Sequence, residues 1–193
     1  MHHSTFILLL FCTCLFFALQ AQENADVSFE QVLSLRNAGS PVISPDGRHI
    51  AFTVRSTDWK NNTYDTEIWL AREGEAPFQL TRTADGSSTS PAWSPDGEWI
   101  AFRAKRGEKT QIHVIRPFGG EAQAVINEEE NIGSFEWSPD GTQFAFTMQE
   151  TEDKEDKERE KRFGAYEIDD ADFKLSHLWL VDFQPDMMPM PQE

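Results

Sequence analysis

The most regular pattern of apolar and polar positions is a short phrase that occurs three times, at residues 42–52, 92–102 and 136–146. Each copy places Ser-Pro-Asp-Gly (SPDG) between two apolar runs, and the run after the glycine ends in a large residue, alanine and phenylalanine. These residues are Ile50, Ala51 and Phe52, then Ile100, Ala101 and Phe102, then Phe144, Ala145 and Phe146. Because successive side chains of a strand point to opposite faces, the large residues share one face and the alanine lies on the other. The pattern predicts a strand that packs closely on both faces.

The SPDG tetrapeptide itself predicts a tight turn. Proline presets φ at the second position, aspartate at the third can accept bonds from nearby backbone N–H groups, and glycine supplies a positive φ at the fourth. A type I turn followed by a left-handed glycine closes a hairpin with a bulge. Since the motif recurs three times, we interpret Ser44, Ser94 and Ser138 as turn residues rather than nucleophiles.

Further strands are predicted in each unit, at residues 67–71, 111–115 and 177–181, and a second turn and a short strand follow in the first two units. The serines of the motif are spaced by 50 and 44 residues. Four-stranded units at this spacing are typical of propeller blades, and stacked solenoid sheets are the structural alternative. We predict an all-β chain, a partial β-propeller of about three four-stranded antiparallel blades with a short N-terminal helix. The expected blades are residues 40–83, 84–127 and 128–193.

Residues 1–21 have the composition of a secretory signal peptide. The apolar run from Phe6 to Leu19 carries no charge and is short for a membrane span, and Ala21 is a plausible last residue before cleavage. An uncleaved anchor is the alternative. Cys12 and Cys14 both lie in this segment, so the mature chain would have no thiol and no disulfide. We expect a secreted or periplasmic protein with no stable membrane association after cleavage.

Residues 22–39 form a lead-in segment in which the pattern predicts a short helix. Ser28 is the expected N-cap and Gln31 completes a capping box. Apolar residues form a partial stripe along one side of the predicted helix, and Gly39 is the expected end of the helix. The stripe consists of Phe29, Val32, Leu33 and Leu35.

Composition narrows the classes of partner. The 193 residues are 39% hydrophobic and 12% aromatic, which suffices for a packed core, and the formal net charge is -16. Phosphate binding needs clustered lysine and arginine, so this acidity argues against nucleic acids and anionic membranes as partners.

No metal or cofactor site is predicted. His49, His113 and His177 fall at equivalent-looking strand positions of separate units, without the spacing of a metal motif. The aspartates at 169, 170 and 172 lack a glycine-turned calcium loop, and residues 61–63 form a glycosylation acceptor that matters only in a eukaryotic secretory host. A charged insertion at about 149–174 pairs opposite charges such as Glu150 and Lys154, which favours an exposed helix or a solvated loop.

The repeated phrase resembles the WD-like blades of TolB-type propellers and of the propellers in prolyl oligopeptidase family serine peptidases. Two stretches resemble the peptidases more closely: residues 29–47, FEQVLSLRNAGSPVISPDG, are similar to the lead-in helix and first blade of secreted dipeptidyl-peptidase and acylaminoacyl-peptidase-like members. Residues 161–182 resemble the matching region of bacterial members. The resemblance implies a propeller of seven or eight blades that caps an α/β-hydrolase domain.

The sequence contains no G-x-S-x-G nucleophile turn, and the nearest match, GSSTS at 86–90, is interpreted as the loop between the first two blades. No catalytic residue of the family can therefore be assigned, and we predict that this chain alone is inactive. We expect the non-catalytic, N-terminal propeller portion of a longer peptidase, which gates the access of short peptide substrates to a C-terminal hydrolase domain. The alternative is a TolB-like periplasmic propeller that acts as a protein-binding scaffold.

Overall fold

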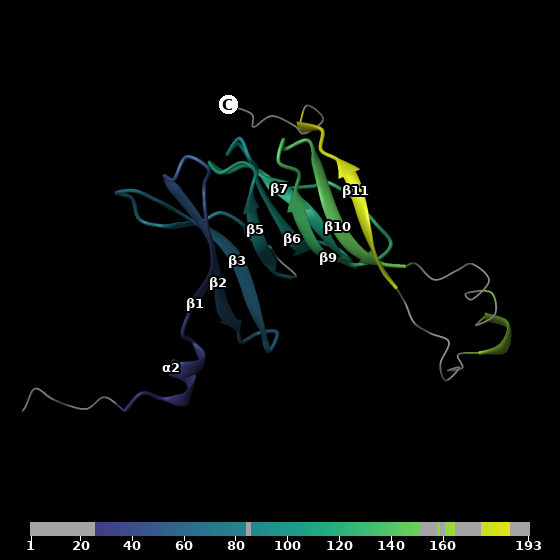
Figure 1. Cartoon of the computed structure of the whole chain (residues 1–193). Coiled ribbons are helices and arrows are strands. Elements are labelled where there is room, and N and C mark those ends of the chain that lie inside the picture. Colours follow the sequence, from purple (N-terminus) through teal and green to yellow (C-terminus); the bar gives the residue numbers. More distant parts are fainter. Residues whose placement is uncertain (1–25, 84–85, 151–157, 159–160, 165–174, 186–193) are drawn as a thin grey trace, which may run out of the picture. The chain divides into compact units, whose positions relative to one another are not determined.

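A computed structural model describes residues 26–83, 86–150, 158, 161–164 and 175–185. The chain divides into two units, residues 1–35 and 36–193. The first contains helix α2 (Phe29–Leu33) and the second contains strands β1 to β11 (Figure 1). The proposed signal peptide, both cysteines, the three aspartates of the insertion and Lys154 lie outside the described residues.

Helix α2 begins as the sequence predicts. Ser28 Oγ accepts a hydrogen bond from the Gln31 backbone N–H, and Gln31 Oε1 accepts one from the Ser28 N–H. The predicted end is wrong, because the helix stops at Leu33 and Gly39 lies in strand β1, opposite Thr53. The chain enters strand β1 at Asn37, two residues before Gly39, because it pairs there with strand β2. None of the residues of α2 is buried.

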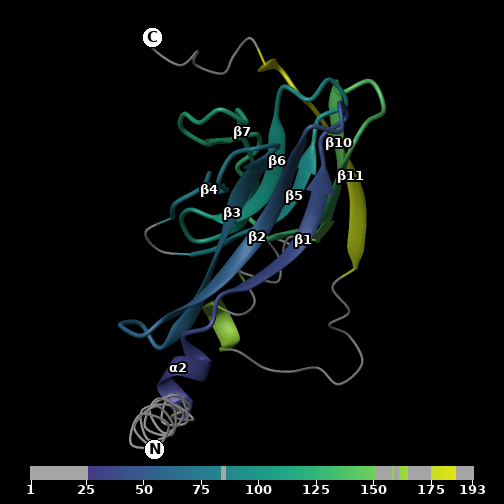
Figure 2. The ribbon, with the colours of Figure 1, turned by 90° about the vertical axis from the view of Figure 1, so that its left-hand side faces the viewer.

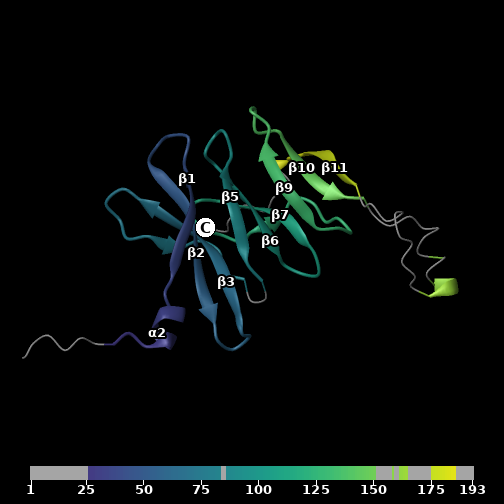
Figure 3. The same ribbon diagram turned by 60° about the horizontal axis from the view of Figure 1, so that its bottom comes forward.

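The described residues of the second unit form three antiparallel sheets (Figure 3). The first comprises β1 (Asn37–Ile43), β2 (His49–Asp58), β3 (Thr63–Arg72) and β4 (Phe78–Gln79). The second comprises β5 (Ser88–Trp93), β6 (Ile100–Lys105), β7 (Thr110–Ile115) and β8 (Gln123–Ala124). The third has the order β11-β10-β9, with β9 (Ile132–Trp137), β10 (Gln143–Gln149) and β11 (Ser176–Asp182). The prediction of an all-β partial propeller is confirmed, with three strands in the described part of the third sheet.

The predicted SPDG turns close the first hairpin of every sheet. In the first copy the Gly47 N–H donates to the Ser44 carbonyl and the Ser44 N–H donates to the His49 carbonyl, each at 2.9 Å. Gly47, Gly97 and Gly141 have φ of 72°, 76° and 72°, the left-handed region that glycine enters at little cost. The same two backbone bonds recur in the other copies.

A bulge that the sequence analysis did not predict interrupts the first strand of the first sheet and of the second sheet. The register shifts between Gly39 and Val42 in β1, and between Thr89 and Ala92 in β5. A serine with positive φ precedes a proline at both points, Ser40 at 46° and Ser90 at 54°. Proline cannot donate to a strand ladder and is tolerated at bulges, so the Ser-Pro dipeptide is the available sequence signal.

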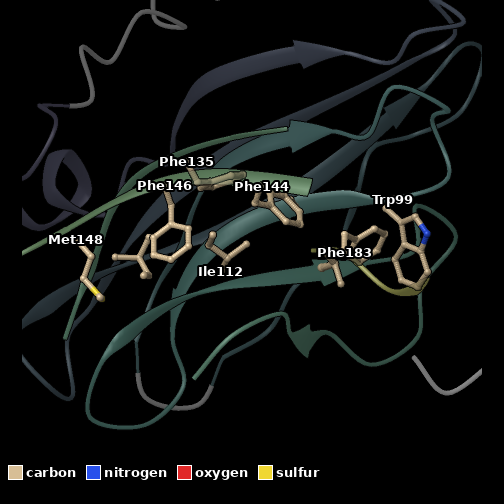
Figure 4. Close-up of a cluster of buried hydrophobic side chains, with 10 residues drawn as sticks. Trp99, Ile112, Phe135, Phe144, Phe146, Met148 and Phe183 are labelled. Atoms are coloured by element: carbon tan, nitrogen blue, oxygen red, sulfur yellow. The ribbon is translucent and has the colours of Figure 1, made fainter. Parts of the chain in front are cut away.

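The sheets pack through two different faces. We call the side with Ala51, Ala101 or Ala145 the alanine face of its sheet, and the side with Phe52, Phe102 or Phe146 the phenylalanine face. Ala51, Ile68 and Leu70 of the first sheet pack against Ile100, Phe102 and Ile115 of the second. Ala101, Ile112 and Val114 pack in the same way against Phe144, Phe146 and Met148 of the third (Figure 4). The predicted alternation of large and small faces is confirmed, because the alanine faces of the first and second sheets each receive the phenylalanine face of the next sheet.

Candidate functional site

The first SPDG turn brings together the three residue types of a serine-hydrolase triad, in an arrangement that does not fit the chemistry. Ser44 Oγ donates to Asp46 Oδ1 at 2.5 Å and accepts from the His49 backbone N–H at 2.9 Å. The His49 ring interacts with the same Asp46 oxygen at 3.7 Å. A catalytic serine must donate to the histidine, which the aspartate orients. Ser44 instead donates to the carboxylate and is only 5% exposed, so it is not an activated nucleophile.

The other two copies repeat this geometry without a histidine. Ser94 donates to Asp96 at 2.5 Å and Ser138 donates to Asp140 at 2.6 Å. Trp99 and Gln143 stand where the first copy has His49. The serine hydroxyl is the main cause that holds the pKa of Asp46 and of Asp140 below its ordinary value. The geometry assigns the three serines to turn closure.

The turns also join neighbouring sheets. We call the side of the sheets that carries residues 44–47, 94–97 and 138–141 the SPDG end. Trp93 Nε1 donates to the Val42 carbonyl of the preceding sheet at 3.2 Å, and Trp137 Nε1 donates to the Ala92 carbonyl at 3.3 Å. Sequence reasoning missed this role of the two tryptophans.

Proline and glycine of successive turns lie close together where neighbouring sheets meet. A β-carbon built on Gly97 would lie 3.6 Å from Pro45 Cδ, and one built on Gly141 would lie 3.3 Å from Pro95 Cδ. A β-carbon on Gly47 would meet nothing within 4 Å. The motif therefore specifies both a hairpin turn and its stacking on the turn of the preceding sheet.

The opposite side of the sheets is variable. We call it the hairpin end, and it carries the β2–β3 loop (59–62), the β6–β7 loop (106–109), the end of β10 and the start of β11 (Figure 2). The second sheet has a pocket of about 450 Å³ here, between the β6–β7 loop and residues 127–129. Arg106, Lys109, Glu128 and Glu129 surround it, so the pocket presents both signs of charge.

His113 lies in the wall of this pocket. Its ring stacks on Phe102 with 5.8 Å between centroids, and its Nδ1 is 3.3 Å from the Gln111 carbonyl oxygen. Burial lowers the pKa of His113 below its ordinary value, and the charge of Arg106 adds to this effect. The side chain is therefore largely neutral at neutral pH, and it can offer one donor and one acceptor.

Two buried polar residues that sequence reasoning missed fix the connections at the hairpin end. Gln111 accepts from the Glu128 N–H at 3.0 Å and donates to the Glu128 and Glu130 carbonyls, each at 3.1 Å. Glu67 holds the equivalent position in the first sheet and accepts from Thr81 Oγ1 at 2.5 Å and from the Thr83 N–H. The only signal was that each predicted third strand begins with a polar residue.

The other candidates do not converge on a site. The histidines do not occupy equivalent positions, which corrects the sequence prediction: His49 begins β2, His113 faces Phe102 and His177 pairs with Met148. In the described part of the chain, no group of three His, Cys, Asp or Glu side chains could hold a metal ion. Within the described ranges, no helix is long and apolar enough to cross a membrane.

The GSSTS segment and the glycosylation triplet each span the end of a loop and the start of a strand. Residues 86–87 are in the loop between the sheets, but Ser88 begins β5 and is fully buried, so the predicted loop is too long. Its Oγ lies 3.2 Å from Thr83 Oγ1. Asn61 is exposed in the β2–β3 loop and donates to Asp58 at 2.7 Å.

Comparison with known proteins gives concordant results. The model of the TolB beta propeller domain (PD40) matches residues 19–168. The chain is 27% identical to the uncharacterized peptidase YuxL of Bacillus subtilis, over 70% of this chain and 21% of that protein. It is 31% identical to dipeptidyl-peptidase 5 of Porphyromonas gingivalis, over 61% of this chain and 17% of that protein. The chain thus spans about a fifth of the length of these curated relatives.

A solved structure has the same fold. The acylaminoacyl peptidase of Pyrococcus horikoshii superposes with a TM-score of 0.57 and 19% identity, over 78% of this chain and 24% of that one. At this level of identity the likeness concerns the fold.

Proposed function

The chain belongs to the TolB β-propeller domain family, and from that premise we propose that it is the non-catalytic propeller portion of a secreted serine peptidase. In this proposal the propeller limits access to a hydrolase domain of the same polypeptide, so that short peptides reach the nucleophile. The observation that carries the proposal is the sequence match to two peptidases over 61% and 70% of this chain.

The engagement of the SPDG serines supports a non-catalytic role. Each hydroxyl donates to an aspartate and accepts a backbone N–H, so none is available to attack a peptide carbonyl. The sequence also lacks G-x-S-x-G. Since acyl transfer needs a nucleophile with an adjacent base, the chemistry is assigned to residues outside this chain.

The hairpin end supports the gating part of the proposal. Variable loops on a repeated scaffold are where recognition is usually placed. The mixed-charge pocket beside His113 lies at this end, and β10 ends and β11 begins here, with 26 residues of sequence between them. We propose that this end faces the peptide substrates, and that the connection helps to select them by length.

Secretion is part of the same proposal. It rests on residues 1–21, whose composition is that of a signal peptide. The expected location is the periplasm or the extracellular space.

A scaffold of the TolB type is the second candidate. The observation that favours it is the family model itself, which describes TolB propellers. Such a protein would bind partner proteins in the periplasm and would need no catalytic domain.

A fluorophosphonate probe, which labels activated serines, separates the two candidates. We expect the polypeptide that carries this chain to be labelled, and residues 1–193 alone to remain unlabelled. A full polypeptide that is folded and binds partner proteins but is not labelled would overturn the peptidase proposal in favour of the scaffold.

The gating role is tested in the same polypeptide by deleting residues 150–162. We expect a broader range of peptide lengths to be hydrolysed. The matched control replaces these residues with glycine and serine at equal length, which separates the charge of the connection from its bulk. Unchanged length preference in both variants would contradict the gating role.

A further inference from the structure

The pocket at the hairpin end of the second sheet has two walls that are bonded to each other. The β6–β7 loop (106–109) forms one wall and residues 127–129 form the other, and the volume between them is about 450 Å³. Lys109 Nζ lies 3.2 Å from Glu130 Oε2, and Gln111 Nε2 donates to the Glu130 carbonyl at 3.1 Å. The volume suits a small molecule, and these bonds form the pocket before a ligand enters it.

His113 presents a hydrogen-bond acceptor to this pocket. Its Nδ1 is 3.3 Å from the Gln111 carbonyl oxygen, which can only accept, so Nδ1 carries the proton and Nε2 carries a lone pair. Within the described residues Nε2 has no hydrogen-bond partner, although His113 is only 5% exposed. Stacking on Phe102 fixes the plane of the ring. A ligand that donates an N–H to Nε2 therefore makes a bond that the folded chain leaves unmade.

Side chains of both charges stand at the mouth of the pocket. Arg106 is exposed and forms no ion pair with the described residues, and its guanidinium lies 5.8 Å from the centroid of the Phe102 ring. The carboxylates of Glu108 and Glu128 belong to the same opening and are also exposed. Arg106 repels a ligand with two positive charges, and the glutamates repel one with two negative charges. The pocket therefore favours a ligand that carries one charge of each sign.

We infer that this pocket binds a small zwitterion with an ammonium group and a carboxylate, as free amino acids and dipeptides have. The ammonium would donate to His113 Nε2 in the negative field of the glutamates, and the carboxylate would accept two parallel hydrogen bonds from the Arg106 guanidinium. The inference is independent of the proposed function, because the second sheet and the segment that follows it supply every residue of the pocket.

An NMR titration of the full chain, followed by the ligand resonances, tests the inference with L-alanine and L-alanyl-L-alanine. N-acetyl-L-alanine and L-alaninamide are the matched probes, since each lacks one of the two charges. We expect at least one zwitterion to bind, and both matched probes to bind about tenfold or more weakly than L-alanine or the dipeptide. The tighter of the two zwitterions then identifies the source of the ligand. No binding of either zwitterion at about 10 mM, or equal binding of all four probes, would overturn the inference.

Two substitutions test whether binding takes place in the pocket. Arg106→Gln removes an exposed guanidinium, and His113→Phe keeps an aromatic ring but removes the acceptor, so each should weaken binding of the zwitterion about tenfold or more. Lys105→Gln is the matched control, because it removes a positive charge at the neighbouring exposed position outside the pocket. Equal affinities of the Arg106→Gln and Lys105→Gln variants would overturn the inference. Tighter binding of putrescine than of both zwitterions would assign the pocket to polycations and would also overturn it.

Discussion

The SPDG end and the hairpin end of the sheets follow different rules. At the SPDG end three copies of one turn repeat the same hydrogen bonds, and tryptophan, proline and glycine join each sheet to the next. At the hairpin end the loops differ in length and composition, and a buried Glu67 or Gln111 holds the connection that follows the last strand of its own sheet. The repeated residues therefore hold the sheets together, whereas the loops of the hairpin end differ between sheets and are free to differ in what they bind.

The largest expected effect sharpens this comparison at the alanine faces. Ala101→Leu should destabilise the chain by about 1–3 kcal/mol, because it overpacks a fully buried position between the second and third sheets. Ala145→Leu is the matched control on the alanine face of the third sheet, where Leu178 and Leu180 are 73% and 67% exposed, and we expect it to change the free energy of unfolding far less. Denaturant melts of both variants measure the difference, and equal losses would show that the faces are not packed as described.

Turn stacking predicts a difference between two glycine variants. Gly47→Ala and Gly141→Ala both place alanine at a φ of 72°, which costs about 1–2 kcal/mol. Only Gly141→Ala also crowds Pro95 Cδ, at 3.3 Å from the new β-carbon. Gly141→Ala should therefore lower the melting temperature more than Gly47→Ala. The reverse order would refute a role for proline–glycine stacking.

The indole hydrogen bonds between neighbouring sheets predict a smaller loss of stability. Trp93→Phe keeps an aromatic ring but removes the N–H that donates to the Val42 carbonyl, and we expect it to destabilise the chain by about 1 kcal/mol. Trp59→Phe is a suitable control, because Trp59 is exposed in the β2–β3 loop. Equal chemical denaturation midpoints for the two variants would argue against a stabilising role of the Trp93–Val42 hydrogen bond between the sheets.

The smallest expected effect belongs to the hairpin end and appears as a pH dependence. The pKa of His113 is lowered in the folded chain by burial, so the unfolded chain binds the proton more readily. The contribution of His113 to the free energy of unfolding is fully present above the pKa of the unfolded chain, about 6.5, and it is lost as the pH falls below that value. We expect the melting temperature of the His113→Gln variant to depend less on pH between pH 7 and 5 than that of the parent chain. Asp46 and Asp140, whose pKa values are lowered, act only near pH 4 and below.

The sequence predicts the repetitive half of this structure well. The hairpin turn and the alternation of large and small faces follow from local rules, since glycine after Pro-Asp sets the turn and Ala51 between Ile50 and Phe52 sets the faces. The capping box at Ser28 is equally local. The peptidase resemblance of the sequence also agrees with the relatives found.

What the sequence did not predict depends on contacts between distant residues. The indole bond of Trp93 crosses to Val42 in another sheet, and Gln111 reaches Glu128 in a connection far along the chain. The wrong helix end at Gly39 has the same cause, because pairing with Thr53 competes with the helix and wins. The three histidines appeared equivalent by strand counting, and only the registers separate them.

The most direct test of the central claim is Ser94→Ala in the complete polypeptide that carries this chain. The variant loses the hydroxyl that bridges Asp96 and the Trp99 N–H, so we predict a lower melting temperature and an unchanged kcat/KM for a short peptide. An unchanged melting temperature with kcat/KM reduced about a hundredfold or more would make Ser94 a catalytic residue and contradict the assignment of the SPDG motif to assembly of the sheets.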